Sequence, residues 1–156
     1  MGVTDDEVAA LLAERAITRV LHRYVQGVDR YRMAQVRACY WDDAVDSHAP
    51  HFEGPVDDYV RWLAEVLPAI AAISHQFTNI LITAEPSTGT ATVESYCLNA
   101  LVPRPVDGVP SDRQLQCLRY LDRFERRHDE WRIAQRQVVR DWTWVLAPSA
   151  FVVEAE

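Results

Sequence analysis

Helical and strand-like periodicities occupy separate parts of this sequence, and their order limits the folds that are open to it. Apolar residues recur close to the 3.6-residue period between Val8 and Val28, which predicts one long amphipathic helix. Thr4 and Glu7 have the spacing of a capping box, so this helix is expected to begin beside them. Shorter helices are predicted from Met33 to Tyr40 and from Pro55 to about Leu67.

Strand-like segments fill most of the remaining chain. A short strand is expected at Ala44–His48, after a turn at Trp41–Asp43, and four long β segments follow: Ser74–Ala84, Thr90–Val102, Arg113–Arg127 and Trp131–Leu146. Helices that come first and antiparallel strands that come later are typical of the α+β class, with the helices on one face of the sheet. Long strands curl such a sheet, and a pocket is expected between its concave face and the first helix. No linker interrupts the pattern, so residues 1–156 are interpreted as one domain.

Charge and composition exclude several functions. The net charge is −7 and all 16 basic residues are arginine, so a Schiff-base lysine and a phosphate-binding P-loop lysine are both excluded. The arginines between Arg119 and Arg140 alternate with acidic and apolar residues, which is typical of solvated strand faces. We therefore expect no nucleic-acid partner, because phosphate binding needs clustered positive charge.

The sequence also indicates a location in the cytoplasm. No apolar stretch approaches the length of a membrane span, and no basic segment followed by an apolar run opens the chain. The three cysteines, Cys39, Cys97 and Cys117, are widely spaced and are interpreted as small core residues in a reducing compartment. We expect no membrane partner.

Four sequence segments, in their order and spacing, resemble one known family. They are Tyr24–Asp29, Tyr40–Ala44, Ser74–Asn79, and Arg119–Arg127 followed by Trp131–Ile133. Together they resemble the SnoaL-like proteins of the nuclear-transport-factor-two-like superfamily, over roughly residues 7–145. The resemblance implies a curved, mixed or antiparallel sheet that forms a cone, with helices packed on its concave face.

Within that superfamily the chain is similar to hexachlorocyclohexane dehydrochlorinase, scytalone dehydratase and bile-acid 7α-dehydratase, which are lyases without a cofactor. The resemblance implies that Asp29 and His75 form a general-base pair, and it also assigns catalytic roles to Tyr24 and Arg140. Two positions depart from scytalone dehydratase: Leu101 lies near the place of its second histidine, and His48 lies near the place of a pocket tyrosine.

The residue types fit that chemistry, although each has a structural alternative. A neutral imidazole at His75 removes a proton, and a carboxylate on its other nitrogen fixes the tautomer; alternatively, Asp29 caps its helix and His75 is a core residue. Tyr24 lies about 140° from Asp29 around a regular helix, so the two share a face only if the helix loosens near Gly27. Arg140 either holds an anionic group or pairs with Asp141.

The remaining candidates concern the pocket and metal binding. Asp46, His48 and His51 lie close together but do not match a zinc pattern, so we expect no metal and no cofactor, and interpret His48 as a pocket residue. The side chains expected to line or adjoin an apolar, substrate-binding cavity are those of Phe77, Cys97, Leu101, Trp142 and Trp144. At the level of sequence these are indistinguishable from ordinary core residues.

The sequence thus predicts a lyase of the dehydratase kind, or an isomerase, acting on a small hydrophobic molecule that contains a ring. Two alternatives stay open: a non-catalytic structural or ligand-binding subunit similar to the small subunit of ring-hydroxylating dioxygenases, and a polyketide-type cyclase. Apolar residues on the uncovered sheet face predict a homodimer or homotrimer.

Overall fold

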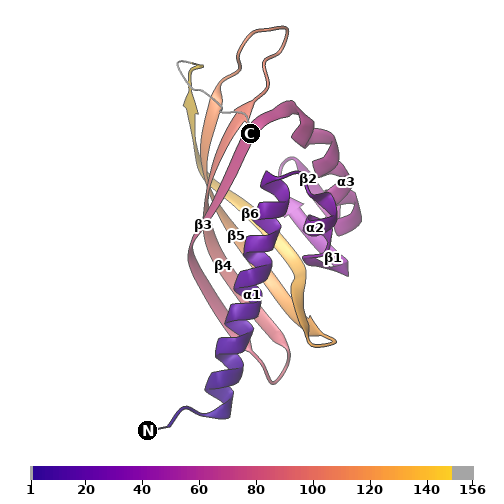
Figure 1. Cartoon of the computed structure of the whole chain (residues 1–156), viewed down its shortest axis with the longest axis vertical. Coiled ribbons are helices and arrows are strands. Elements are labelled where there is room, and N and C mark those ends of the chain that lie inside the picture. The colour runs from indigo at the N-terminus through magenta and orange to yellow at the C-terminus, as the bar shows by residue number, and fades with distance from the viewer. Residues whose placement is uncertain (1, 149–156) are drawn as a thin grey trace.

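The computed structural model describes residues 2–148, in which the chain forms three α-helices, a short 3-10 helix and six strands (Figure 1). The helices are α1 (Asp5–Asp29), α2 (Met33–Arg37), α3 (Val56–Val66) and the 3-10 helix η1 (Leu67–Ala69). The strands are β1 (Tyr40–His48), β2 (Phe52–Pro55), β3 (Ile70–Glu85), β4 (Thr90–Pro103), β5 (Arg113–Arg127) and β6 (Glu130–Leu146). The predicted α+β class is confirmed, and the elements that were predicted occur in the predicted order.

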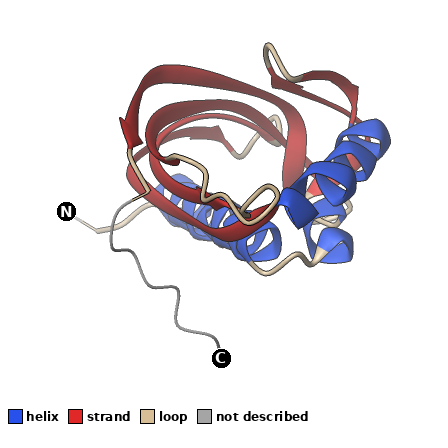
Figure 2. Cartoon of the chain, turned by 90° about the horizontal axis from the view of Figure 1, so that it is seen from above, coloured by secondary structure: helices blue, strands red, loops and turns tan. Residues whose placement is uncertain are grey.

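The strands form one mixed sheet in the order β2-β1-β6-β5-β4-β3. The pairings are antiparallel except that β1 runs parallel to β6. Seen from above, the long strands curl into an open cone and the helices lie along one side of it (Figure 2). The predicted four-strand meander is therefore present, and the two short strands extend the sheet at the edge next to α3.

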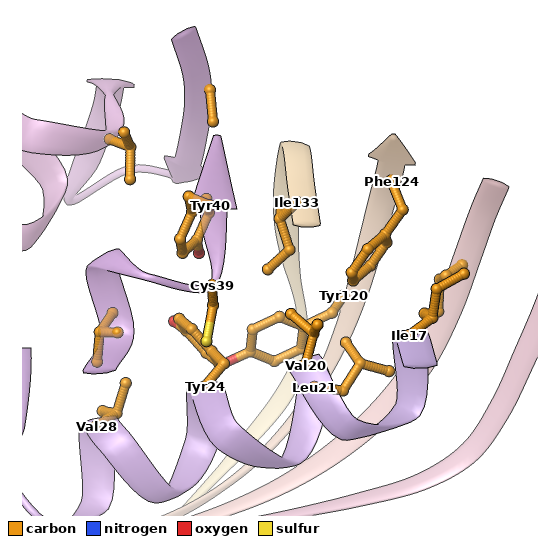
Figure 3. Packing of buried hydrophobic residues seen from close by; sticks show 14 of the residues in the cluster. Ile17, Val20, Leu21, Tyr24, Val28, Cys39, Tyr40, Tyr120, Phe124 and Ile133 are labelled. Atoms are coloured by element: carbon orange, nitrogen blue, oxygen red, sulfur yellow. The ribbon is translucent and has the colours of Figure 1, made fainter. Parts of the chain in front are cut away.

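Helix α1 forms where the sequence predicts it and closes the concave face of the sheet. The Thr4 hydroxyl accepts a hydrogen bond from the Glu7 backbone N–H at 3.3 Å, and the Glu7 carboxylate accepts one from the Thr4 N–H at 2.8 Å. This capping box satisfies N–H groups that the first turn leaves free. One face of the helix is buried at helical spacing, and Figure 3 shows it packed against the strands, with Ile17, Leu21, Tyr24, Tyr120, Phe124 and Ile133 among the cluster.

Gly27 does not loosen the helix, the condition under which Tyr24 and Asp29 would share a face. The helix stays regular to Asp29. A Cβ atom at Gly27 would lie 2.9 Å from Cγ2 of Val36, closer than side-chain carbons approach. The missing side chain therefore lets α2 pack directly against the end of α1, next to the candidate site.

The ends of several elements differ from the sequence prediction, and one strand was not predicted. The second helix ends at Arg37, and residues 41–43, expected as a turn, belong to β1, whose pairing with β6 shifts register between Tyr40 and Val45. Strand β2 was not expected, because four residues are too few to establish an alternating pattern.

None of the helices within residues 2–148 is long and apolar enough to cross a membrane.

Candidate active site

His75 and Asp29 are in direct contact. The Asp29 Oδ1 atom lies 2.6 Å from Nδ1 of His75, and its Oδ2 atom accepts a hydrogen bond from the His75 backbone N–H at 3.0 Å. Both side chains are largely buried, with 6% of the His75 side chain and 16% of the Asp29 side chain exposed. Because the carboxylate accepts at Nδ1, the neutral ring carries its proton there, and Nε2 is left with a free lone pair. Nε2 has no hydrogen-bond partner among the described residues.

The end of α1 and the start of β3 bring the pair together. Asp29 is the last residue of α1, and His75 lies six residues into β3. Two residues after Asp29, the Tyr31 hydroxyl donates a hydrogen bond to the Ile70 carbonyl at 3.0 Å, which fixes the helix end against the first residue of β3. The carboxylate is thus positioned by the fold, and it holds both the backbone and the ring of His75.

A cavity of about 530 Å³ lies in front of His75. Helices α1 and α3 form one side of it, the end of β1 closes another, and strands β3 to β6 form its floor. Residues named from the sequence that line it are Tyr24, His48, His75, Leu101 and Arg140, together with His51. Asp29 does not line the cavity and lies behind His75, which is the position expected for a residue that orients a base.

Tyr24 lines the same cavity, although it does not share a helix face with Asp29. Its side chain is almost fully buried, and its hydroxyl lies 2.5 Å from the Tyr59 hydroxyl of α3. Burial raises the pKa of Tyr24, and the charge of Arg136 offsets this only in part. Burial also raises the pKa of Tyr59 well above its ordinary value. Both phenols therefore keep their protons at neutral pH and act as hydrogen-bond donors.

A second histidine and carboxylate pair lies on the same cavity. Nδ1 of His48 and Oδ1 of Asp46 are in short hydrogen-bond contact, and the Asp46 side chain has no exposed surface. The other Asp46 oxygen accepts a hydrogen bond from the Tyr40 hydroxyl at 2.7 Å. Nε2 of His48 lies 3.3 Å from the Tyr59 hydroxyl, and the two rings stack with centroids 4.8 Å apart. The His48 ring is thereby fixed on both sides.

A buried ion pair lies below these tyrosines. Arg136 donates two hydrogen bonds to Asp122, at 2.7 and 2.6 Å, and neither side chain has exposed surface. The guanidinium carbon lies 4.1 Å from the ring centroid of Tyr24 and 4.7 Å from that of Tyr120. Burial opposes the charge of Arg136, but the Asp122 carboxylate and nearby hydroxyls outweigh this and raise its pKa well above the ordinary value. The rings of Tyr24, Tyr40 and Tyr120 lie close together (Figure 3), and this tyrosine layer packs against the Arg136 guanidinium.

Amide side chains form a polar band across the cavity floor. His75 pairs with Asn99 across β3 and β4, and Asn99 pairs with Gln116 across β4 and β5. The Asn99 amide nitrogen lies 3.5 Å from Gln116 Oε1, and Gln116 donates to Gln114 at 2.7 Å. Oδ1 of Asn99 is buried and has no hydrogen-bond partner among the described residues. The floor therefore offers donors and acceptors close to the base.

Arg140 and the two tryptophans expected with it do not share a face. Arg140 pairs with Leu118, which lines the cavity, whereas Trp142 pairs with Cys117, which does not. One extra residue of β6, Asp141, lies between these pairs, and such a bulge reverses the alternation of the strand. The exposed fractions of Trp142 and Trp144 are 47% and 60%, so these side chains lie outside the cavity. Arg140 is exposed at the cavity and forms no hydrogen bond or ion pair with other described residues, whereas Asp141 pairs with Arg119.

Cys97 and Phe77, expected to line or adjoin the cavity, are not part of its lining and pack behind its wall. Cys97 is fully buried, and burial raises the pKa of its thiol to about 12, so it behaves as a small apolar side chain. Phe77 packs its ring edge against Tyr120, with centroids 4.8 Å apart. Phe77 and Cys97 are partners across β3 and β4, and this pair lies two residues along the strands from the pair of His75 and Asn99.

Sequence reasoning missed three groups of this site. Asp46 and His48 are two residues apart in a strand and so share a face. His48 was predicted as a pocket residue, but Asp46 was considered only as a possible metal ligand, and the pair was not recognised. Tyr59 was not singled out, because a phenol at helical spacing is indistinguishable from a core residue. Gln114 and Gln116 lie on the same face of their strand as Leu118 and Tyr120, because side chains alternate along a strand. Amide side chains on the face expected to be buried were the signal that would have identified the polar floor.

Comparisons with known proteins agree with this architecture. The SnoaL-like domain family matches residues 9–137 of the chain. A crystal structure of hexachlorocyclohexane dehydrochlorinase LinA type 2 superposes with a TM-score of 0.82 at 19% identity, covering 94% of this chain and 97% of that chain. A proposed scytalone dehydratase from Novosphingobium aromaticivorans DSM 12444 gives 0.79 at 22% identity, with 95% and 98% covered.

A third similar structure is LinA type 3 from Novosphingobium barchaimii LL02, with a TM-score of 0.79 at 20% identity and coverage of 95% and 99%. No curated protein sequence matches the chain. At these identities the structural likeness establishes the fold, here the nuclear-transport-factor-two-like fold. Together with the match over residues 9–137, it shows that the chain belongs to the SnoaL-like domain family.

Proposed function

We propose that this protein is a cofactor-independent lyase or isomerase that acts on a small hydrophobic molecule containing a ring, with His75 as the general base. The state of the His75 ring is the observation that supports this most directly. Asp29 occupies Nδ1, while Nε2 has no described partner and the ring lines the cavity. A cavity of about 530 Å³ with mainly apolar walls suits a small ring compound.

In the lyase reaction, Nε2 of His75 takes a proton from a substrate carbon. The electrons of that C–H bond form a double bond to the neighbouring carbon, and the leaving group departs with the electrons of its own bond. Asp29 stabilises the imidazolium that forms. In an isomerase, the same proton returns to a different carbon. The similar structures named as a dehydrochlorinase and a dehydratase support an elimination reaction.

Two further residues are proposed to bind the developing charge. The Tyr24 hydroxyl lines the cavity and keeps its proton, so it donates a hydrogen bond to a substrate oxygen. Arg140 lies exposed at the cavity without a described partner, which suits a carboxylate or an enolate oxygen.

Elimination activity with a panel of hydroxylated and halogenated ring ketones tests this proposal, with loss of water or hydrogen halide followed by mass spectrometry. Wild-type protein should convert at least one member, and His75→Ala should lower the rate about 10²-fold or more. His22→Ala is the matched control, because His22 is an exposed histidine of α1. A ligand that quenches tryptophan fluorescence, is not converted and binds His75→Ala equally well would contradict the enzyme and favour the ligand-binding alternative.

A further inference from the structure

We propose that His48 is the general acid of this site, which protonates a leaving hydroxyl of the substrate so that it departs as water. The inference rests on the proposed function, because it assigns the second half of the elimination that His75 begins. It concerns the leaving group, which the base alone does not determine.

The cavity holds two histidine and carboxylate pairs supplied by different elements. His75 is held by Asp29 from α1, and His48 is held by Asp46 on its own strand, β1. In both pairs the carboxylate occupies Nδ1, so Nε2 is the nitrogen left for chemistry. One base is enough to remove one proton from the substrate. The second imidazole, which is also held in one orientation on the cavity, is therefore available for a second proton transfer, to the leaving group.

The surroundings of the two Nε2 atoms differ in a way that assigns the roles. Nε2 of His75 has no partner among the described residues and is free to reach a substrate carbon. Nε2 of His48 lies 3.3 Å from the Tyr59 hydroxyl, so it is already in hydrogen-bond contact with an oxygen atom. A substrate hydroxyl beside Tyr59 would meet the same nitrogen, and His48 therefore matches an acid that protonates oxygen.

The hydroxyls near His48 support proton delivery to oxygen. Tyr59 lies 3.3 Å from His48 and 2.5 Å from Tyr24, and all three side chains line the cavity. Burial raises the pKa of both phenols, so they remain donors and orient the departing oxygen. Asp46 is completely buried and anchored by Tyr40, which leaves the ring little freedom to rotate.

The identity of the leaving group follows from the presence of an acid. Halide departs as a stable anion and needs no proton, whereas hydroxide is a poor leaving group unless it is protonated as it departs. In the proposed step His75 takes the α-carbon proton, the C–H electrons form the C=C bond, and the C–O electrons remain on oxygen. His48 begins the step as an imidazolium beside the Asp46 carboxylate, so both of its ring nitrogens carry protons. The departing oxygen takes the Nε2 proton and leaves as water, and His48 becomes neutral. Proton transfer from His75 to His48 through solvent restores the starting state, with no net gain or loss of protons.

A matched pair of substrates separates this inference from the proposed function: a β-hydroxy ring ketone and its β-chloro counterpart. His48→Gln should lower elimination of water about 100-fold or more and elimination of chloride less than about tenfold. His75→Ala should lower both, because both need the base. His22→Gln is the control for the substitution itself, and circular dichroism with thermal unfolding establishes that each variant is folded.

Equal losses on both substrates, or no loss on either, would show that His48 is not the acid. Selective loss of water elimination in His75→Ala, with both reactions lost in His48→Gln, would reverse the two roles. If His75→Ala leaves both rates unchanged, the proposed function fails and this inference fails with it. The wild-type protein supplies a second test that needs no variant: a solvent deuterium isotope effect is expected for the hydroxyl substrate and not for the chloride, and its absence from both would overturn the assignment.

Discussion

At the scale of single residues, the Asp29 carboxylate makes two hydrogen bonds to one residue, and both constrain the base. One oxygen accepts from the His75 backbone N–H and the other contacts the ring. A backbone N–H can only donate, so whichever atom faces it must be an acceptor. The chemistry of position 29 is therefore restricted more tightly than a simple ion pair would require.

Asp29→Asn is expected to inactivate the base without disturbing the fold. The amide oxygen must take the place opposite the backbone N–H, which puts the NH₂ group against Nδ1 and moves the ring proton to Nε2. A base protonated on its working nitrogen cannot accept, and kcat should fall on the order of 10³- to 10⁴-fold. Nitrogen-15 chemical shifts of His75 report the tautomer, and Asp6→Asn, at an exposed position in the same helix, is the control. Unchanged kcat with the altered tautomer would rule out His75 as the base.

At the scale of elements, the contact between α1 and α2 depends on one glycine. Gly27→Ala places a methyl group 2.9 Å from Cγ2 of Val36 and 3.2 Å from its backbone nitrogen, and Val has little rotamer freedom with which to respond. The free energy of unfolding should fall by about 1–3 kcal/mol, the usual cost of overpacking. Urea denaturation measures it, with Arg19→Ala as a control on an exposed face of the same helix. An alanine variant as stable as wild type would show that α2 moves freely relative to α1.

Elements of this protein were predictable where periodicity extends over many residues. The apolar repeat and the Thr4–Glu7 spacing predicted α1, and alternation predicted four long strands. Strand β2 was not predictable because it spans only Phe52–Pro55, and the bulge at Asp141 leaves no mark in the sequence. The side of the sheet on which Trp142 lies therefore depended on hydrogen-bond register, which sequence alternation does not reveal.

The candidate site was predictable to a smaller extent. Asp29 and His75 were identified through resemblance, because nothing local links a helix end to a strand residue 46 positions later. Tyr59 contacts His48 only through the packing of α3 on β1, a long-range contact that no local pattern encodes. Residues that are brought together by tertiary packing are found by family resemblance or by structure.

At the scale of the whole molecule, four buried tyrosines make stability depend on alkaline pH. Burial raises the pKa values of Tyr24, Tyr40, Tyr59 and Tyr120 above the ordinary value of 10.0. Below about pH 10 these hydroxyls are protonated in both the folded and the unfolded protein, and the free energy of unfolding does not depend on them through pH. Above it the unfolded chain loses protons that the folded chain keeps, so the free energy of unfolding falls by about 1.4 kcal/mol per pH unit for each hydroxyl.

Chemical denaturation between pH 9 and about pH 11.5 measures this slope. Tyr59→Phe should reduce it by the contribution of one hydroxyl. Tyrosinate absorbance from the buried residues should appear together with loss of near-ultraviolet circular dichroism. Ionisation of the buried hydroxyls while the native dichroism persists would contradict the prediction.

Assembly of the whole molecule stays a prediction. The end of β6 exposes large apolar side chains, among them Trp142, Trp144, Val145 and Leu146. Trp142, Trp144 and Leu146 share one face of the strand, because side chains alternate along it. Large exposed apolar side chains on one face are usually covered by a partner, and a homodimer or homotrimer is expected. Light scattering at micromolar concentration measures the mass, and Trp144→Ser should weaken the assembly. A wild-type monomer under these conditions would contradict the prediction.

The Arg136–Asp122 pair below the tyrosine layer has a consequence for how this sequence can evolve. Removing either partner leaves an unpaired charge with no exposed surface, at a cost of about 3–5 kcal/mol, whereas domains are stable by only about 5–15 kcal/mol. A protein in which only one of the two residues has been substituted is therefore close to unfolding. During evolution the ion pair can be lost only if both positions change nearly together. Positions 122 and 136 should covary among relatives, and the aromatic residues above them should be inherited as a block with the ion pair.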